Sequence, residues 1–180
     1  MLFGSYRINE RKESPARLSL HVKNGELNFY ACSVKLIGED LDKLYDWGTD
    51  VMNENWNASK ARKKLKAAPK TLVCDALLDQ TIFAGVGNII KNEVLFRIQV
   101  HPKTRVGDLP PKKLTELIKE ARQYSFDFLE WKKQYVLKKH WLVHTKSICP
   151  RDGAKIIREY VGRTHRRTFF CNTCQVLYSK

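Results

Sequence analysis

A turn with two glycines, Gly85-Val86-Gly87, stands directly before Asn88 and a run in which apolar residues recur every four positions, at Ile90, Val94 and Ile98. This period predicts a half-buried helix over residues 88–98, with Asn88 at its N-cap. The free backbone N–H groups and the positive end of such a helix favour an anion, and the glycines allow a ligand to approach closely. The turn therefore predicts an anion site, with a capped turn that binds nothing as the alternative.

The chain is strongly basic, with 33 Lys and Arg residues against 19 Asp and Glu and a formal net charge of +14. The excess is concentrated between Lys138 and Lys180, where ten basic residues stand against two acidic ones. Such a charge favours a polyanionic partner such as nucleic acid, and a solvated basic surface is the alternative. No signal peptide, bilayer-spanning apolar run or lipidation pattern is apparent, so we expect a cytoplasmic protein, in a bacterial cytosol or nucleoid, without a membrane partner.

The cysteines and the hydrophobic content bound the fold class. Hydrophobic residues make up 43% of the 180 positions, which is enough for at least one core. Of the five cysteines, Cys32 and Cys74 are isolated, and the other three gather near the C-terminus. This distribution does not suggest a disulfide framework. It fits a reducing compartment and a metal site better.

Three zones follow one another along the chain. In residues 1–37, Asn24-Gly25 predicts a hairpin turn, and strands are expected at 5–8, 17–22 and 27–32. In residues 38–140, helical periodicity and proline breaks predict helices at 39–47, 57–66, 70–79, 88–98 and 110–135. In residues 141–180, a short β-hairpin is expected over 155–161 and 168–171.

A cluster of metal-binding residue types brackets that hairpin. Cys149-Pro150-Arg151-Asp152 is followed after eighteen residues by Cys171-Asn172-Thr173-Cys174. Two C-x2-C knuckles would predict a zinc ribbon, because they supply four thiolates in a tetrahedral array. Here Asp152 stands in place of the second cysteine. Carboxylate oxygen also binds zinc, so the pattern predicts a Zn²⁺ site of Cys149, Asp152, Cys171 and Cys174, with a metal-free hairpin as the alternative. His165 is expected to be exposed rather than a ligand.

With these motifs assembled, the chain resembles the formamidopyrimidine-DNA glycosylase and endonuclease VIII family of base-excision repair enzymes over essentially its whole length. Leu77-Leu78-Asp79-Gln80, the segment 85–90, Glu93-Val94-Leu95-Phe96 and His101-Pro102 resemble the family's helix–two-turn–helix signature. The segment from Cys149 to Gln175 resembles its zinc-finger signature. The resemblance implies an α+β fold with a partial β-sandwich remnant over 1–37, a helix–two-turn–helix DNA-binding domain over 38–140 and a zinc-finger-like β-hairpin over 141–180.

The resemblance also implies roles for individual residues. Asn88, with Gly87 beside it, would hold a DNA phosphate next to the lesion. Arg166, five residues before Cys171, would grip the phosphates that flank the extruded nucleotide, and Arg167 would take this role if the hairpin register slipped. The opening Met1, Leu2 and Phe3 resemble the strand and loop that fill the space left by a flipped base, and a plain strand with core-facing Leu2 and Phe3 is the alternative.

The catalytic segment of that family has no counterpart in this sequence. Its members begin with a proline whose secondary amine attacks the sugar C1′ carbon, followed by a glutamate, and they carry a lysine later in the first β-domain. None of these aligns here, where the first residue is Met1, so we expect no catalytic residue in this chain. The chain is then expected to be either a fragment of a longer enzyme or a naturally truncated protein that retains only recognition.

The resemblance implies damaged-DNA binding in base-excision repair, as in a bifunctional DNA glycosylase/AP lyase that removes oxidised bases. A non-catalytic DNA-binding protein of this family is the alternative, and an RNA-binding helix–two-turn–helix protein is the third hypothesis. The implied partner is double-stranded DNA with oxidised bases or abasic sites, bound by a monomer. We expect Asp79, Gln80 and Glu93 to tie the two turns together rather than act as acid or base, and a solvated or phosphate-contacting face at Lys60, Lys63 and Lys64.

Overall fold

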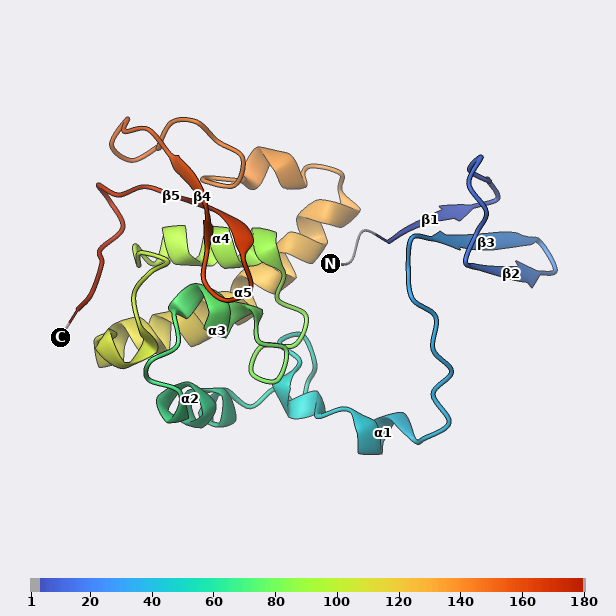
Figure 1. Cartoon of the computed structure of the whole chain (residues 1–180), viewed down its shortest axis with the longest axis horizontal. Helices are drawn as coiled ribbons and strands as arrows, with labels where there is room; N and C mark the ends of the chain where they lie inside the picture. The colour runs from blue at the N-terminus through green and yellow to red at the C-terminus, as the bar shows by residue number, and fades with distance from the viewer. Residues whose placement is uncertain (1–3, 180) are drawn as a thin grey trace. The chain divides into compact units, whose positions relative to one another are not determined.

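The computed structural model describes residues 4–179, and the chain divides into two compact units, Met1–Leu44 and Tyr45–Lys180. Figure 1 shows strands in the first unit and, in the second, helices together with a hairpin of two strands. None of the described helices combines the length and apolarity that a bilayer-spanning segment requires. The α+β fold class predicted from the sequence is confirmed.

The first unit is a three-stranded antiparallel sheet in the order β1-β3-β2, formed by β1 Ser5–Ile8, β2 Leu18–Val22 and β3 Gly25–Tyr30. The predicted hairpin is present, but its two-residue turn is Lys23-Asn24, because Gly25 already pairs with Val22. Helix α1, Leu41–Leu44, is a single turn rather than the helix predicted at 39–47. No residue of α1 is buried, so no packing extends it.

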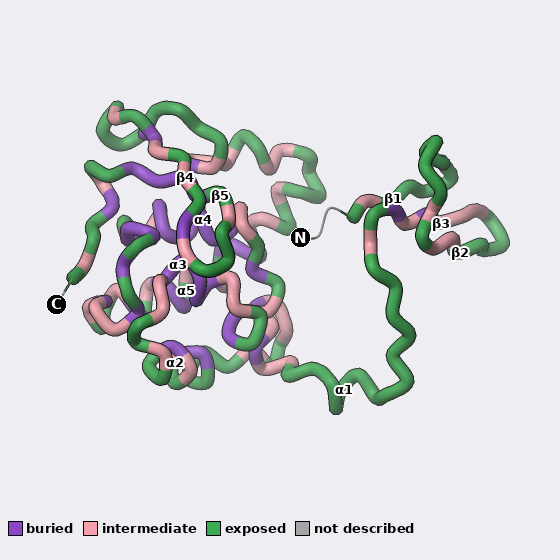
Figure 2. Tube along the Cα trace, viewed as in Figure 1, coloured by how far each residue is buried: buried purple, intermediate pink, exposed green. Residues whose placement is uncertain are grey.

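One face of this sheet carries apolar side chains, several of which are exposed among the described residues. Tyr6 and Leu18 both lie opposite Phe29, and Ile8 and Leu20 both lie opposite Leu27, so these six side chains share a face. Tyr6 is 60% exposed and Ile8 is 58% exposed. Figure 2 shows exposed residues over much of this unit. The opposite face of the sheet is more closely packed. On that face Asn28 is buried and donates to the carbonyl oxygen of Glu10 and to the carboxylate of Glu26.

The second unit packs four helices with a hairpin of two strands. The helices are α2 Ala58–Ala67, α3 Val73–Leu78, α4 Asn88–Arg97 and α5 Pro111–Lys133. Short 3-10 turns lie at Trp47–Thr49, Val106–Asp108 and Leu137–His140. Strands β4 Ile157–Val161 and β5 Arg166–Phe170 pair antiparallel. The four predicted helices from 57 onward are all present, and α3 begins three residues later than predicted.

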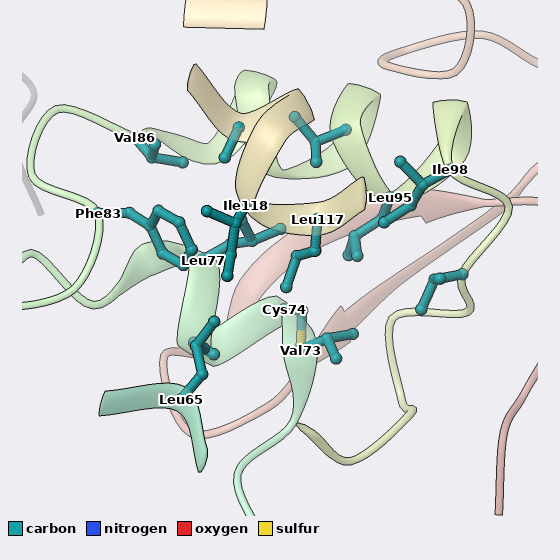
Figure 3. Close-up of a cluster of buried hydrophobic side chains, with 14 of the residues drawn as sticks. Leu65, Val73, Cys74, Leu77, Phe83, Val86, Leu95, Ile98, Leu117 and Ile118 are labelled. Atoms are coloured by element: carbon teal, nitrogen blue, oxygen red, sulfur yellow. The ribbon is translucent and has the colours of Figure 1, made fainter. Parts of the chain in front are cut away.

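The core of this unit gathers side chains from α2 to α5 around Leu77, Phe83 and Leu117, all of which are fully buried. Figure 3 shows these residues pointing toward one another. Cys74 lies in the same cluster and forms no disulfide, and burial raises the pKa of its thiol to about 11. A second, smaller cluster around Phe96 and Phe169 lies under the hairpin. Both clusters belong to residues after Tyr45.

We expect residues 45–180 to fold without residues 1–44, because both hydrophobic clusters lie within the second unit. Urea unfolding followed by circular dichroism, on the whole chain and on the shortened one, measures this. The unfolding midpoint of the helical signal should be the same for both chains. A shortened chain that loses cooperative unfolding would contradict the division into two units.

Candidate nucleic-acid interface and metal centre

Two side chains brace the turns that precede α4. The Asp79 carboxylate accepts hydrogen bonds from the backbone N–H of Thr81 at 2.9 Å and from its hydroxyl at 2.7 Å. The Gln80 amide nitrogen donates to the carbonyl oxygens of Leu78 and Val86, and its amide oxygen accepts from the N–H of Gly85 at 3.0 Å. Asp79 and Gln80 therefore have the structural role expected of them.

The start of α4 differs from the prediction in one respect. Gly87 is the N-cap, since its carbonyl accepts the first helical bond from the N–H of Lys91, and Asn88 is the first helical residue. The prediction that Asn88 caps the helix is wrong. Its side chain turns instead toward the hairpin and donates from Nδ2 to the carbonyl oxygen of Arg167 at 2.9 Å. The Asn88 Oδ1 atom is buried and has no hydrogen-bond partner within residues 4–179.

The two candidate arginines begin strand β5. Arg166 pairs with Val161 and Arg167 with Tyr160, so the register separates their positions along the hairpin. The Arg167 guanidinium donates to the Tyr160 hydroxyl at 3.3 Å, which lowers the pKa of that hydroxyl. None of the ion pairs between described residues involves either arginine. His165 is exposed, as expected, and stacks on Tyr160.

The structure therefore brings together three of the predicted site residues, Asn88, Arg166 and Arg167, and Gly87 adjoins them in the chain. The predicted wedge of Met1, Leu2 and Phe3 lies outside the described residues. On α2, the Lys60 ammonium lies 2.6 Å from the Asp46 carboxylate, and Lys64 also faces Asp46, at 3.8 Å. Lys60 and Lys64, two of the three lysines expected on a solvated or phosphate-contacting face, thus each have a carboxylate neighbour and remain partly exposed.

Helix α4 buries three consecutive polar side chains, which sequence periodicity did not reveal. Lys91, Asn92 and Glu93 are at most 1% exposed, and all residues from Ile90 to Phe96 are buried, so the prediction of a half-buried helix is wrong. The Lys91 ammonium donates to the Thr168 hydroxyl at 2.7 Å. These polar residues are buried because the hairpin and the segment before it cover the helix.

Asn92 and Glu93 hold two segments of that cover. The Asn92 amide nitrogen lies 2.9 Å from Nδ1 of His144, and burial lowers the pKa of this imidazole to about 4. The Glu93 carboxylate accepts hydrogen bonds at 2.8–3.1 Å from the backbone N–H groups of Leu142, Val143 and His144. Glu93 thus anchors the segment before the hairpin. The expectation that it ties the two turns together is wrong.

The metal cluster has the geometry that its sequence spacing predicted. The ligand atoms of Cys149, Asp152, Cys171 and Cys174 all lie within 4.8 Å of one another. The sulfur atoms of Cys149 and Cys174 are 3.8 Å apart. Tetrahedral zinc with bonds of about 2.3 Å to sulfur would separate two thiolates by about 3.8 Å. Burial raises the thiol pKa of both cysteines, and a bound cation would offset that effect. These four residues can hold a metal ion.

Arg151 joins this cluster to the end of α4. Its guanidinium donates to the carbonyl oxygens of Phe96 at 2.7 Å and Arg97 at 3.1 Å, and it lies over the Phe96 ring. A cation at the C-terminal end of a helix also interacts favourably with the helix dipole. The hairpin is therefore held at both ends of α4, by Asn88 at the start and by Arg151 at the end.

Fold and site define a class: a helix–two-turn–helix domain followed by a hairpin with a metal-binding cluster. Residues 47–134 match the formamidopyrimidine-DNA glycosylase H2TH domain. Endonuclease 8-like 3 of Mus musculus is 32% identical over 190 residues, covering 96% of this chain and 30% of the relative. Endonuclease 8-like 2 of Bos taurus is 32% identical over 190 residues, covering 97% of this chain and 56% of the relative. This chain thus carries the H2TH domain of the formamidopyrimidine-DNA glycosylase and endonuclease VIII family, as the sequence predicted, and spans about half or less of these relatives' length.

Solved structures share the fold. MutM in complex with carbocyclic 8-oxo-G containing DNA superposes with a TM-score of 0.82 at 24% identity, over 97% of this chain and 72% of that chain. A viral DNA glycosylase gives a TM-score of 0.77 at 21% identity, over 98% of this chain and 75% of that chain.

The burial of Lys91 gives a pH dependence. Burial lowers the pKa of its ammonium to about 8 from 10.5. Between these values the unfolded chain binds this proton and the folded chain releases it, so the free energy of unfolding rises with pH, by about 3 kcal/mol in total. Below pH 8 the contribution is constant. Urea unfolding of the natural chain and of Lys91→Met, from pH 7 to 10.5, isolates the effect as the difference between the two curves. A flat difference would contradict a depressed lysine pKa.

Proposed function

We propose that this chain binds double-stranded DNA at an oxidised base or abasic site through the phosphates that flank it. The observation that carries this proposal is the junction of Asn88 with Arg167. It sets the positive N-terminal end of a ten-residue helix beside the two arginines that begin β5. The first turn of a helix has backbone N–H groups without helical partners, which suit a phosphate, and the arginines add the charge.

Three further observations support DNA as the partner. The net charge of +14 favours a nucleic-acid partner. Relatives carry the name endonuclease 8-like, and solved structures with this fold include MutM and Lactococcus lactis Fpg in complexes with damaged DNA. The hairpin with its cysteine cluster argues against a helix–two-turn–helix protein that binds RNA. Tighter binding to structured RNA than to abasic duplex would favour that other hypothesis.

Arg166→Ala is expected to weaken binding to an abasic-site duplex regardless of the flanking sequence. It should also reduce the slope of log Kd against log salt by about one, because one phosphate contact is lost. Fluorescence anisotropy between low and physiological salt measures both. Lys132→Ala is the control, since it removes one charge from an exposed side chain in the last turn of α5, away from the start of α4. Unchanged affinity and slope in Arg166→Ala would contradict the proposal.

We also propose that the metal is zinc and that it closes the base of the hairpin. Three thiolates and one carboxylate form a donor set that zinc accepts, with Asp152 in the position of the fourth ligand. When bound, the ion contributes folding free energy to a hairpin whose own hydrophobic cluster is small.

Native mass spectrometry of the chain purified without chelator is expected to show one zinc ion. Asp152→Ala should lower the zinc affinity, because it removes a ligand, and Asp152→Cys should restore or raise it, because it completes four thiolates. Chelator titration ranks the three chains. Absence of zinc from the natural chain, or equal affinity in Asp152→Ala, would contradict the ligand set.

Removal of the damaged base is an activity distinct from binding and needs its own test. A DNA glycosylase/AP lyase needs an amine nucleophile. The residues that carry our proposal, Asn88, Arg166 and Arg167, supply recognition of DNA, and none of them is such an amine. Borohydride trapping on abasic-site DNA decides the matter. A covalent adduct with this chain would overturn recognition without catalysis, and binding without an adduct would support it.

A further inference from the structure

The turn that joins β4 to β5 is held by a carboxylate from another part of the fold. Asp75 of α3 is buried and accepts three hydrogen bonds: from the backbone N–H of Arg163 at 2.8 Å, and from the backbone N–H and hydroxyl of Thr164 at 3.1 and 3.0 Å. One carboxylate thus binds the turn directly before Arg166. Hydrogen bonds to a charged acceptor are about twice as strong as neutral ones.

The approach of this turn to Asp75 is so close that the chain needs a glycine there. Gly162 has φ +75°, and a Cβ atom built on it would lie 2.5 Å from both carboxylate oxygens of Asp75. His165, at the other end of the turn, has φ +46°, a conformation that residues other than glycine rarely adopt. Its N–H donates to the carbonyl oxygen of Gly162 at 3.2 Å. The backbone on the N-terminal side of Arg166 is therefore fixed.

A second buried charge holds the strand on the other side of Arg166. The Lys91 ammonium of α4 donates to the hydroxyl of Thr168, which is itself buried. The Asn92 side-chain oxygen lies 3.4 Å from the N–H of Phe169, the next residue. Arg166 is thus flanked by two anchors, one from α3 and one from α4. Both lie apart from the cysteine cluster, which holds the other end of the hairpin.

We infer that Asp75 is a positioning residue for DNA binding: together with Lys91 it fixes the backbone around Arg166, so that the guanidinium projects from a set point beside the start of α4. The inference rests on the proposed function, because Arg166 must contact phosphate for its position to matter. A long arginine side chain loses conformational entropy when it binds, and a fixed backbone reduces the number of conformations lost.

The test is a double-mutant cycle in the whole chain, with Asp75→Asn and Arg166→Ala alone and combined, and anisotropy on an abasic-site duplex as the readout. Asparagine has the shape of aspartate, but its NH2 group would face a backbone N–H of Arg163 or Thr164 and lose a hydrogen bond. Asp75→Asn should bind about tenfold more weakly. The double variant should bind no more weakly than Arg166→Ala, because both changes act on the same phosphate contact, that of Arg166.

The direction of the change in DNA affinity distinguishes a positioning role of Asp75 from an effect of its charge. Replacing a carboxylate by an amide makes the protein more positive, which by long-range electrostatics strengthens DNA binding. Asp127→Asn, at a half-exposed position of α5, has the same charge change and is the matched control, with affinity equal to or above that of the natural chain. Weaker binding in Asp75→Asn alone therefore supports positioning.

Three outcomes are distinguishable. If the natural chain does not bind the duplex, or if Arg166→Ala binds as well as it does, the proposed function fails. The natural chain and Arg166→Ala can both bind as proposed. The positioning inference is then overturned if Asp75→Asn has the affinity of the natural chain, or if the double variant loses the affinity that both single changes lose together. If circular dichroism shows that Asp75→Asn does not fold, Thr164→Val carries the test: it removes only the hydroxyl bond to Asp75, and the same coupling with Arg166→Ala is expected.

Discussion

The polar segment Lys91-Asn92-Glu93 of α4 is the contact on which the second unit depends. Buried polar groups without partners cost free energy, so these side chains are compatible with the core only where the hairpin and the segment before it supply the partners. Thr168, His144 and the backbone of residues 142–144 supply them. The helix and its cover are therefore interdependent: neither surface is satisfied without the other.

This dependence explains why the candidate DNA contacts can come from two motifs that are far apart in sequence. Asn88 belongs to the helical motif and Arg166 to the hairpin, yet the hydrogen bonds along α4 place both at its start. The cysteine cluster and Arg151 perform the corresponding task at the other end of the helix. The proposed phosphate-binding surface is thus assembled from short side-chain contacts and needs no large interface of its own.

The sequence could predict what depends on local spacing. Helical period and proline breaks located α2, α4 and α5 within two residues, and the two knuckle spacings located the metal cluster, because these signals involve residues near one another in the chain. It could not predict the Asn88 contact, because an asparagine after glycine fits an N-cap equally well. Asp75 and Lys91 were missed for a similar reason: their partners lie 89 and 77 residues away, and no periodic pattern marks such pairs. Three consecutive polar residues inside an apolar helix were the one available signal.

The exposed apolar side chains of the β1-β3-β2 sheet have a consequence for the behaviour of the chain in solution. Tyr6, Ile8 and Val22 present apolar surface to water, and such surface favours association between copies. The net charge of +14 opposes that association by mutual repulsion. Salt screens the repulsion but leaves the apolar attraction intact. We therefore expect a higher salt concentration to act on this chain twice: it weakens the proposed phosphate contacts of the second unit and favours contact between the exposed sheets of neighbouring molecules.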